Sequence, residues 1–407
     1  MKHLKNIFRT ILPFLSACLA VSSIQAQPAL RPDYLDSVEV SLLTCQPHDE
    51  VYSLYGHTAL RWHDLHPGGI DAAFNYGVFD FNRPHFVLRF VFGLTDYELG
   101  AFPFRLFCAE YRHFGSKVTE QILNLTRQEK AVLFDALRDN LRPENAVYRY
   151  NFFYSNCTTK ARDIIEQCIN GHIEYTDRKE YTPSFREIIH SMTHKNPWSR
   201  FGNDLLLGVK ADLPTDRREQ EFLPDHLMYD FDHAVICHND STRPLVLTTR
   251  TAVPAGVPLT QDGFPLTPAE CAWLLLTMAV ILFVAQWRRG RSFLVWDALL
   301  MVATGTLGII LTLMLFSQHP TVSLNLQIIL LNPLPWIYLW PVVRRRDTRY
   351  WSLTALLCIL FLAGSLVQHY AEGIHVLALC LLLQCCVHRR DMLQRWVTMS
   401  LAGRKNH

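Results

Sequence analysis

Apolar residues gather in the last third of the chain, and this distribution constrains the fold more than any other feature. Five apolar stretches follow Pro265, at about 267–287, 294–316, 322–343, 351–368 and 371–387. Each is close to the length, about 17–25 residues, that an α-helix needs to cross the hydrocarbon core of a bilayer. The sequence therefore predicts an all-α bundle of about five transmembrane helices over residues 267–388, followed by a tail over residues 389–407.

The arginines around these stretches predict their orientation. Arginine-rich segments lie at 288–291, 344–346 and 389–390, whereas the connections 317–321 and 369–373 contain no Lys or Arg. Basic connections remain in the cytoplasm. With five spans, the bundle then begins outside and ends inside, so we expect the tail to be cytoplasmic and the preceding domain to face the periplasm at the cytoplasmic (inner) membrane.

The N-terminus independently predicts export. A basic segment over residues 1–9 precedes an apolar run that ends in Gln25-Ala26-Gln27. This pattern is typical of a signal peptide, here residues 1–26. The segment Leu15-Ser16-Ala17-Cys18 also resembles the site at which exported proteins are lipidated on cysteine. We favour cleavage after Ala26 because the apolar run continues past Cys18, and whether Cys18 is lipidated stays open.

Residues 27–250 are expected to form one exported α+β domain, joined to the membrane bundle by a Pro-containing linker over 251–266. Alternating apolar residues predict strands around Val38–Leu42 and Phe74–Val78, and an aromatic run predicts another strand over 86–92. Thr126 and Glu129 form a capping-box pattern at the start of a helix. Its predicted buried face comprises Val132, Leu133, Ala136, Leu137 and Leu141.

Two stretches of this domain, residues 53–61 and 150–160, contain the candidate chemistry. Cys157 directly precedes a helical pattern formed by Ala161, Ile164, Ile165, Cys168 and Ile169. The N-terminus of a helix favours a thiolate, and a nearby imidazole such as His57 would activate it. The alternative interpretation is structural: a buried or disulfide-bonded Cys157, and a His57 that is hydrogen-bonded in the turn after Gly56. The residues alone leave both interpretations open.

Other classes of chemistry lack recognisable motifs. The formal net charge of +2 indicates no nucleic-acid surface. The exported domain has no CxxC pair, and its histidines lack ligand spacing apart from an isolated HxxH at His63 and His66, so we expect no metal site. No phosphate-binding glycine loop or GxSxG motif occurs, and we expect no cofactor. The domain has five cysteines, so at least one thiol is left unpaired.

Several segments resemble a known family. Residues 55–61, 74–77, 150–163 and 203–208 are similar to the Lnb N-terminal periplasmic domain, and the whole plan resembles Lnb-type lipoprotein N-acyltransferases. The order of His and Cys also resembles the permuted papain-like fold of NlpC/P60 and lecithin:retinol acyltransferase-like enzymes, in which an Asn-Cys motif opens a helix. The resemblance implies that Cys157 is the nucleophile and His57 the general base and acid.

The resemblance also implies a reaction and its partners. An acyl chain would pass from a membrane phospholipid to Cys157 as a thioester. It would then pass to the α-amine of the diacylglyceryl N-terminal cysteine of a lipoprotein. We expect phospholipid, diacylated lipoproteins and the membrane as partners. Phospholipid class, acyl position and acyl-chain preference are left open.

The sequence gives weaker support for the remaining site residues. Asn75 is the candidate that orients His57, with His63 and Asp80 as rivals, although Asn75 could simply stabilise a turn. Tyr55, Tyr154 and Asn156 are candidates for oxyanion or substrate binding, and aromatic packing is the alternative for the two tyrosines. Arg61 could bind a lipid phosphate or could be a solvated strand residue.

Two other functions fit the same residues. A periplasmic cysteine peptidase or amidase acting on peptidoglycan would use the same Cys157 and His57 in a polar cleft. A non-enzymatic membrane scaffold or sensor would keep Cys157 as a structural residue. Substituting Cys157 by Ser would abolish either enzyme and would leave the scaffold function intact.

Overall fold

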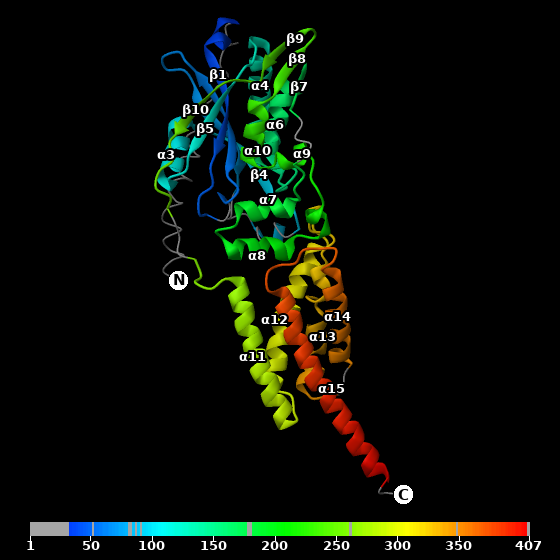
Figure 1. Cartoon of the computed structure of the whole chain (residues 1–407). Helices are drawn as coiled ribbons and strands as arrows, with labels where there is room; N and C mark the ends of the chain where they lie inside the picture. The colour runs from blue at the N-terminus through cyan, green and yellow to red at the C-terminus, as the bar shows by residue number, and fades with distance from the viewer. Residues whose placement is uncertain are drawn as a thin grey trace.

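The computed structural model places an α/β domain above a bundle of helices (Figure 1). It describes residues 32–50, 53–79, 84–85, 88–89, 92–176, 181–259, 263–346 and 349–404, with side chains from 34 to 390. The expected signal peptide, Cys18 and Asp80 lie outside the described residues. The described elements from Pro32 to Val253 form the α/β domain, and those from Pro268 to Arg404 form the bundle.

The lower bundle contains the elements α11 (Pro268–Arg289), α12 (Leu294–Met314), η5 (Leu326–Ile329), α13 (Leu334–Val343), α14 (Tyr350–Gly364) and α15 (Ile374–Arg404). Among the described residues, three segments are long and apolar enough to cross a membrane: Pro268–Arg289, Leu294–Met314 and Leu326–Val343. Helix α14 has only 15 residues. The structure therefore supports a membrane domain, and the count of five spans stays a prediction.

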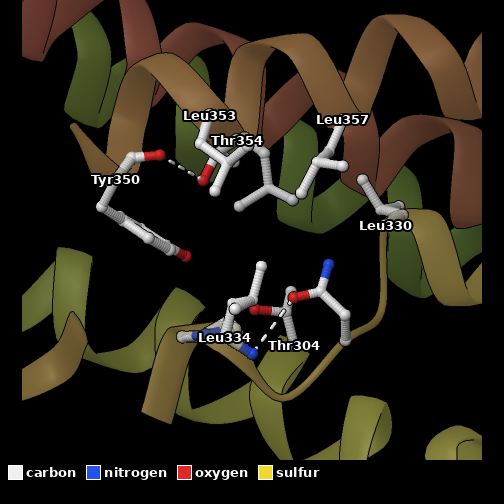
Figure 2. A pocket seen from close by; sticks show the side chains of 10 residues that line it. Thr304, Leu330, Leu334, Tyr350, Leu353, Thr354 and Leu357 are labelled. Atoms are coloured by element: carbon white, nitrogen blue, oxygen red, sulfur yellow. Dashed lines mark hydrogen bonds between the residues drawn. The ribbon is translucent and has the colours of Figure 1, made fainter. Parts of the chain in front are cut away.

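A pocket lies between α12, the start of α13, and α14 (Figure 2). Its leucines include Leu334, Leu353 and Leu357. The hydroxyls of Thr304 and Thr354 donate to backbone carbonyls of their own helices, at 2.7 and 3.0 Å. The pocket is therefore mainly apolar, as expected for a space inside a membrane bundle.

A seven-stranded antiparallel sheet forms the centre of the upper domain, in the order β10-β5-β1-β2-β3-β4-β6. Its strands are β1 (Val38–Cys45), β2 (His57–Asp64), β3 (Asp71–Val78), β4 (Asp96–Pro103), β5 (Val118–Leu123), β6 (Val147–Arg149) and β10 (Val246–Val253). A smaller sheet contains β7 (His172–Glu174), β8 (Val235–His238) and β9 (Ser241–Pro244). Because β10 pairs with β5 as far as Val253, the domain extends past the boundary expected at residue 250.

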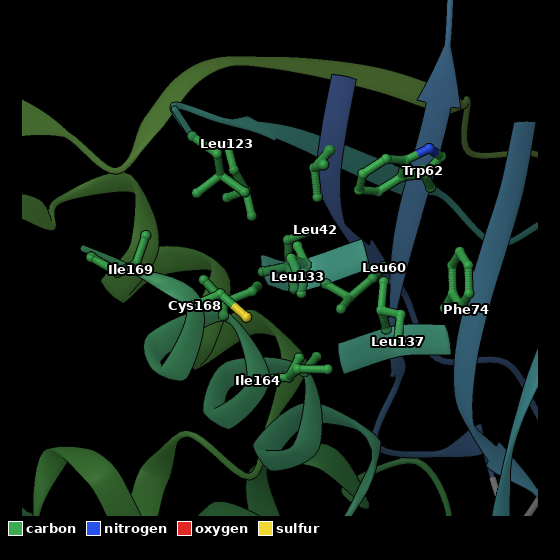
Figure 3. Packing of buried hydrophobic residues seen from close by; sticks show 14 of the residues in the cluster. Leu42, Leu60, Trp62, Phe74, Leu123, Leu133, Leu137, Ile164, Cys168 and Ile169 are labelled. Atoms are coloured by element: carbon green, nitrogen blue, oxygen red, sulfur yellow. The ribbon is translucent and has the colours of Figure 1, made fainter. Parts of the chain in front are cut away.

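Both faces of the large sheet are covered. Helices α4 (Arg127–Asn140) and α6 (Cys157–Cys168) pack on one face, where the core includes Leu42, Leu60, Trp62, Leu133 and Ile164 (Figure 3). Helix α3 (Phe104–Phe114) packs on the other face, against Leu43, Cys45 and Ala59. Successive strand residues point to opposite faces, so Leu42 and Leu43 belong to different core clusters.

Most of the expected local elements are present. Strands β1 and β3 coincide with the alternating segments, and Thr126 caps α4 in a capping box with Glu129. One residue of the predicted buried face of α4 is wrong, because Val132 is 45 % exposed. The strand expected over 86–92 lies largely outside the described residues, and its described positions 88 and 89 are helical.

The upper domain also contains several short helices. They are η2 (Pro32–Ser37), α5 (Pro143–Ala146), α7 (Phe185–Met192), α8 (Pro197–Leu206), η4 (Val209–Asp212), α9 (Arg217–Gln220) and α10 (Pro224–Asp232). Helices α7 and α8 lie between the sheet and the membrane helices (Figure 1).

Hydrogen bonds dock the α8–η4 segment onto the outer loops of the bundle. They run from Gly208 N to Thr321 O (2.8 Å), Val209 N to Leu324 O (2.8 Å), Asn325 Nδ2 to Leu205 O (2.8 Å) and Gln368 Nε2 to Leu207 O (3.0 Å). Arg186 on α7 supports the same segment by ion pairs with Asp204 and Asp212, both at 2.7 Å. The upper domain is therefore held by direct contacts as well as by the linker.

Neighbouring residues of α4 test this account of the core. Leu133 is fully buried, whereas Val132 is 45 % exposed. We expect Leu133→Ala to lower the free energy of unfolding by about 2–5 kcal/mol because it leaves a cavity. Val132→Ala should change it by less than about 0.5 kcal/mol. Denaturation midpoints of the full-length protein in detergent measure both, and equal effects would contradict the assignment of the core.

Candidate active site

Cys157 is the first residue of α6, and Asn156 caps this helix. The Asn156 side-chain oxygen accepts hydrogen bonds from Thr158 N (3.0 Å) and Thr159 N (2.9 Å). Its amide nitrogen donates to the carbonyls of Phe152 (3.0 Å) and Phe222 (2.9 Å). Asn156 is therefore a buried capping residue whose polar atoms are occupied. The expectation that it binds substrate or an oxyanion is not supported, because these contacts hold the helix start instead.

The start of α6 lies against the start of β2. Thr58 and Thr158 join the two elements through a buried hydrogen bond of 3.1 Å between their hydroxyls. Gly56, just before the strand, has a φ of +74°, and a Cβ there would lie 2.7 Å from the Cys45 carbonyl oxygen. Glycine is therefore required in the turn that presents His57. The predicted pair, His57 and Cys157, is brought together by this packing.

The electrostatics of the pair favour a charged nucleophile. Burial raises the pKa of the Cys157 thiol, but His57, the Thr58 backbone N–H and the Thr158 hydroxyl together lower it to about 7. Burial lowers the pKa of His57, and its interactions with Cys157, Glu110 and Asn75 raise it above the usual value overall. A thiolate beside an imidazolium is the form in which a cysteine attacks a carbonyl carbon.

Asn75, the candidate that orients His57, lies beside the imidazole. Its side chain interacts with His57, and its oxygen also accepts a hydrogen bond from Gly77 N at 2.7 Å. A Cβ at Gly77 would lie 2.8 Å from Cε1 of His57, so glycine allows this close approach. The rival His63 is at the other end of β2, with its ring 3.8 Å from Glu39. The rival Asp80 lies outside the described residues.

Arg61 is buried, so its interpretation as a solvated residue was wrong, and its contacts give no support to a role in binding phosphate. It is 7 % exposed and donates to Asp71 (2.7 and 2.9 Å) and to Glu120 (3.0 Å). Its guanidinium also lies 3.6 Å from the centre of the Phe104 ring. Asp71 is on the next strand, β3, but Glu120 of β5 is 59 residues away, so local patterns could not reveal the whole ion-pair cluster.

The two predicted tyrosines have other contacts. Tyr55 accepts a hydrogen bond from Asn203 of α8 at 2.6 Å. Tyr154 donates to Glu219 at 3.4 Å, and Lys210 lies over its ring. Tyr55 therefore links the turn before His57 to the helix that contacts the membrane domain, and Tyr154 faces the α9 region. Neither contact supports a role in binding an oxyanion.

Three other tyrosines lie near the thiol. Tyr97, Tyr148 and Tyr150 each experience the charge of Cys157, and burial raises the pKa of all three phenols. The Tyr97 and Tyr150 rings stack at 4.0 Å, and Tyr97 pairs with Tyr148 across β4 and β6. Buried phenols that stay uncharged near neutral pH therefore border the site. In the sequence, the two-residue spacing of Tyr148 and Tyr150 shortly before Cys157 was the pattern that could have indicated these tyrosines as site residues.

The pH dependence of alkylation tests the Cys157–His57 pair. With a Cys157 pKa of about 7, iodoacetamide should react with half of its maximal rate near pH 7. In His57→Ala the charge that lowers the pKa is gone and burial remains, so we expect the midpoint to rise by about two pH units or more. Mass spectrometry of the Cys157 peptide measures the rate. An unchanged midpoint would contradict the pairing.

A second substitution tests the structural assignment of Arg61. Arg61→Gln removes the buried cation that Asp71 and Glu120 share, while Glu120 keeps its ion pair with Arg250, so it should destabilise the fold by about 1.5–3 kcal/mol. Arg138→Gln removes an exposed ion pair and should change stability by at most about 1 kcal/mol. Denaturation in detergent measures both. Unchanged stability together with weaker binding of anionic lipid would instead support the phosphate-binding interpretation.

Comparison with known families agrees with this architecture. Residues 26–191 match the Lnb N-terminal periplasmic domain, and residues 260–395 match the Lnb transmembrane domain. No curated protein and no solved structure matches the chain. The two matched regions occur in the order of the two parts of the structure and together cover most of the sequence. The chain belongs to the Lnb-type family of membrane proteins with a periplasmic N-terminal domain.

Proposed function

We propose that this protein is a membrane-bound lipoprotein N-acyltransferase with a permuted papain-like catalytic domain. The observation that carries the proposal is the Cys157–His57 pair at the start of α6, in a domain docked onto membrane helices. A thiolate with a pKa of about 7 is a nucleophile suited to acyl transfer near neutral pH. The family match supports the periplasmic location, and the proposed topology is five spans in the inner membrane.

The first half-reaction forms a thioester. The Cys157 thiolate attacks the carbonyl carbon of a phospholipid acyl ester and gives a tetrahedral oxyanion. When the C–O bond breaks, the protonated His57 donates its proton to the departing glycerol oxygen. The products are S-acyl-Cys157, neutral His57 and a lysophospholipid. The unpartnered backbone N–H at a helix start suits an oxyanion, and the first N–H of α6 belongs to Cys157.

The second half-reaction forms an amide. The uncharged α-amine of a diacylglyceryl-modified N-terminal cysteine attacks the thioester carbonyl. The C–S bond breaks, the sulfur leaves as a thiolate, and His57 takes the proton from the attacking nitrogen. The thiolate–imidazolium pair is thereby restored, and the lipoprotein carries a third acyl chain. No cofactor participates in either step.

The docking contacts explain why such an enzyme would be built on a membrane domain. Both substrates have their acyl chains in the bilayer, and the reacting groups lie at its outer surface. Helix α8 contacts the membrane bundle, and its Asn203 donates to Tyr55, two residues before His57. The reactive pair is thus held at a defined height above the bilayer, which reduces the entropy lost in bringing membrane-bound reactants together.

Capture of the acyl-enzyme tests this function. Purified full-length protein is incubated with phospholipid that carries a labelled acyl chain, and intact mass is measured before and after hydroxylamine treatment. We expect one hydroxylamine-sensitive adduct that is absent in Cys157→Ala and forms about 10²–10⁴ times more slowly in His57→Ala. If folded protein forms no adduct with any phospholipid but cleaves peptidoglycan peptides, the peptidase interpretation replaces this one.

A further inference from the structure

Helix α3 places a carboxylate beside the reactive pair. Strand β1 pairs with β2 so that Cys45 is opposite His57. Tyr111 of α3 packs against Cys45 in the same buried cluster, and Glu110 precedes Tyr111 on the helix. The Glu110 carboxylate is close enough for its charge and that of His57 to affect each other. Glu110 therefore borders the site from the face of the sheet opposite to α6.

Glu110 has no ion-pair or hydrogen-bond partner among the described residues, which distinguishes it from the other acidic groups near the site. Glu120 and Asp71, for example, are both occupied by Arg61. Glu110 is also exposed on α3. Partial desolvation by the surrounding protein raises the pKa of its carboxyl, and the charge of His57 lowers that pKa by a smaller amount. An exposed, unpaired carboxylate beside a catalytic imidazole is suited to receive a cation from outside.

Exposed apolar side chains lie on α3 and on the linker after β10, together with the exposed Arg112 and His113. Leu106, one turn before Glu110, is 45 % exposed, and Val257 and Leu259 of the linker are 88 % and 49 % exposed. The linker hydrogen-bonds to the end of α3, from Gly256 N to Gly115 O at 3.0 Å. In the sequence this linker leads to α11, the first membrane helix. A lipid-anchored chain at this surface would find apolar contacts close to Glu110.

We propose that Glu110 binds the acceptor, by holding the primary ammonium group of a lipid-anchored peptide beside His57. This inference rests on the proposed function and names a specificity residue for its second half-reaction. An α-amine has a pKa of about 7.7–8.0, so most acceptor molecules arrive as cations. The held ammonium releases one proton to water, and the resulting amine gives its second proton to His57 as the C–N bond forms and the C–S bond breaks.

The two half-reactions can be measured separately. Full-length protein is first acylated on Cys157 from labelled phospholipid and is then mixed with a synthetic diacylglyceryl-cysteinyl peptide. Because Glu110 raises the pKa of His57, we expect Glu110→Gln to be acylated more slowly than wild type, by a smaller factor than its loss of transfer to the peptide. Its transfer to the peptide at low acceptor concentration should fall about tenfold or more, through a higher KM rather than a lower kcat, since a charge-assisted hydrogen bond contributes about 1.5–3 kcal/mol.

Three controls separate acceptor binding from other effects. Glu144→Gln removes an exposed carboxylate on α5 and should behave as wild type. Glu110→Asp should restore part of the transfer to the peptide. Hydroxylamine, which is mostly uncharged near neutral pH, should release the acyl chain from wild type and Glu110→Gln at equal rates, because it does not need an anionic partner.

Each contrary result has a different meaning. If Glu110→Gln transfers its acyl chain to the peptide with the wild-type KM, acceptor binding by Glu110 is overturned while the acyltransferase function stands. If Glu110→Gln loses acylation and transfer equally, Glu110 acts on His57 and the inference is also overturned. If the wild-type protein forms no acyl-enzyme, the proposed function itself fails and the inference fails with it.

Discussion

The hydrogen bond between Thr58 and Thr158 joins residues that are one hundred positions apart, and the candidate site depends on it. It fixes the first turn of α6 against the first residues of β2, so Cys157 meets His57. The cap by Asn156 keeps that turn helical and satisfies two of its backbone donors. Both contacts are buried, where hydrogen bonds are strong and their loss is costly. A low thiol pKa follows from this geometry, because the helix start and the imidazole act on the same sulfur atom.

The same region is connected to the membrane domain. Tyr55 lies in the turn that presents His57, and it accepts a hydrogen bond from α8. The segment that follows α8 is bonded to the outer loops of the bundle through backbone and amide groups. Unlike a flexible tether, these contacts give the domain one orientation above the bilayer. The position of Cys157 relative to the membrane helices is therefore a property of the fold, and the linker adds only the covalent connection.

Local patterns predicted the elements whose causes are local. The alternation in β1 and β3, the capping box of α4 and the helix after Cys157 all appear in the structure as expected. Residues whose roles depend on partners in other elements were misjudged or missed. Arg61 forms ion pairs with carboxylates of β3 and β5. Glu110 reaches the site only because α3 folds back over β1. Likewise, the sequence indicated a linker between the domains, and no local pattern could reveal the hydrogen bonds that dock them.

The central claim is that Cys157 transfers an acyl chain to a lipoprotein amine, and the mass of the lipoprotein product tests it most directly. The protein and its Cys157→Ser variant would each be produced in a bacterium whose lipoproteins carry a free α-amine. Tandem mass spectrometry of one abundant lipoprotein then reads its N-terminal peptide. The account predicts one additional acyl chain, bonded as an amide, with the wild type and none with the variant. A free α-amine in both strains, or the same acylated product in both, would contradict it.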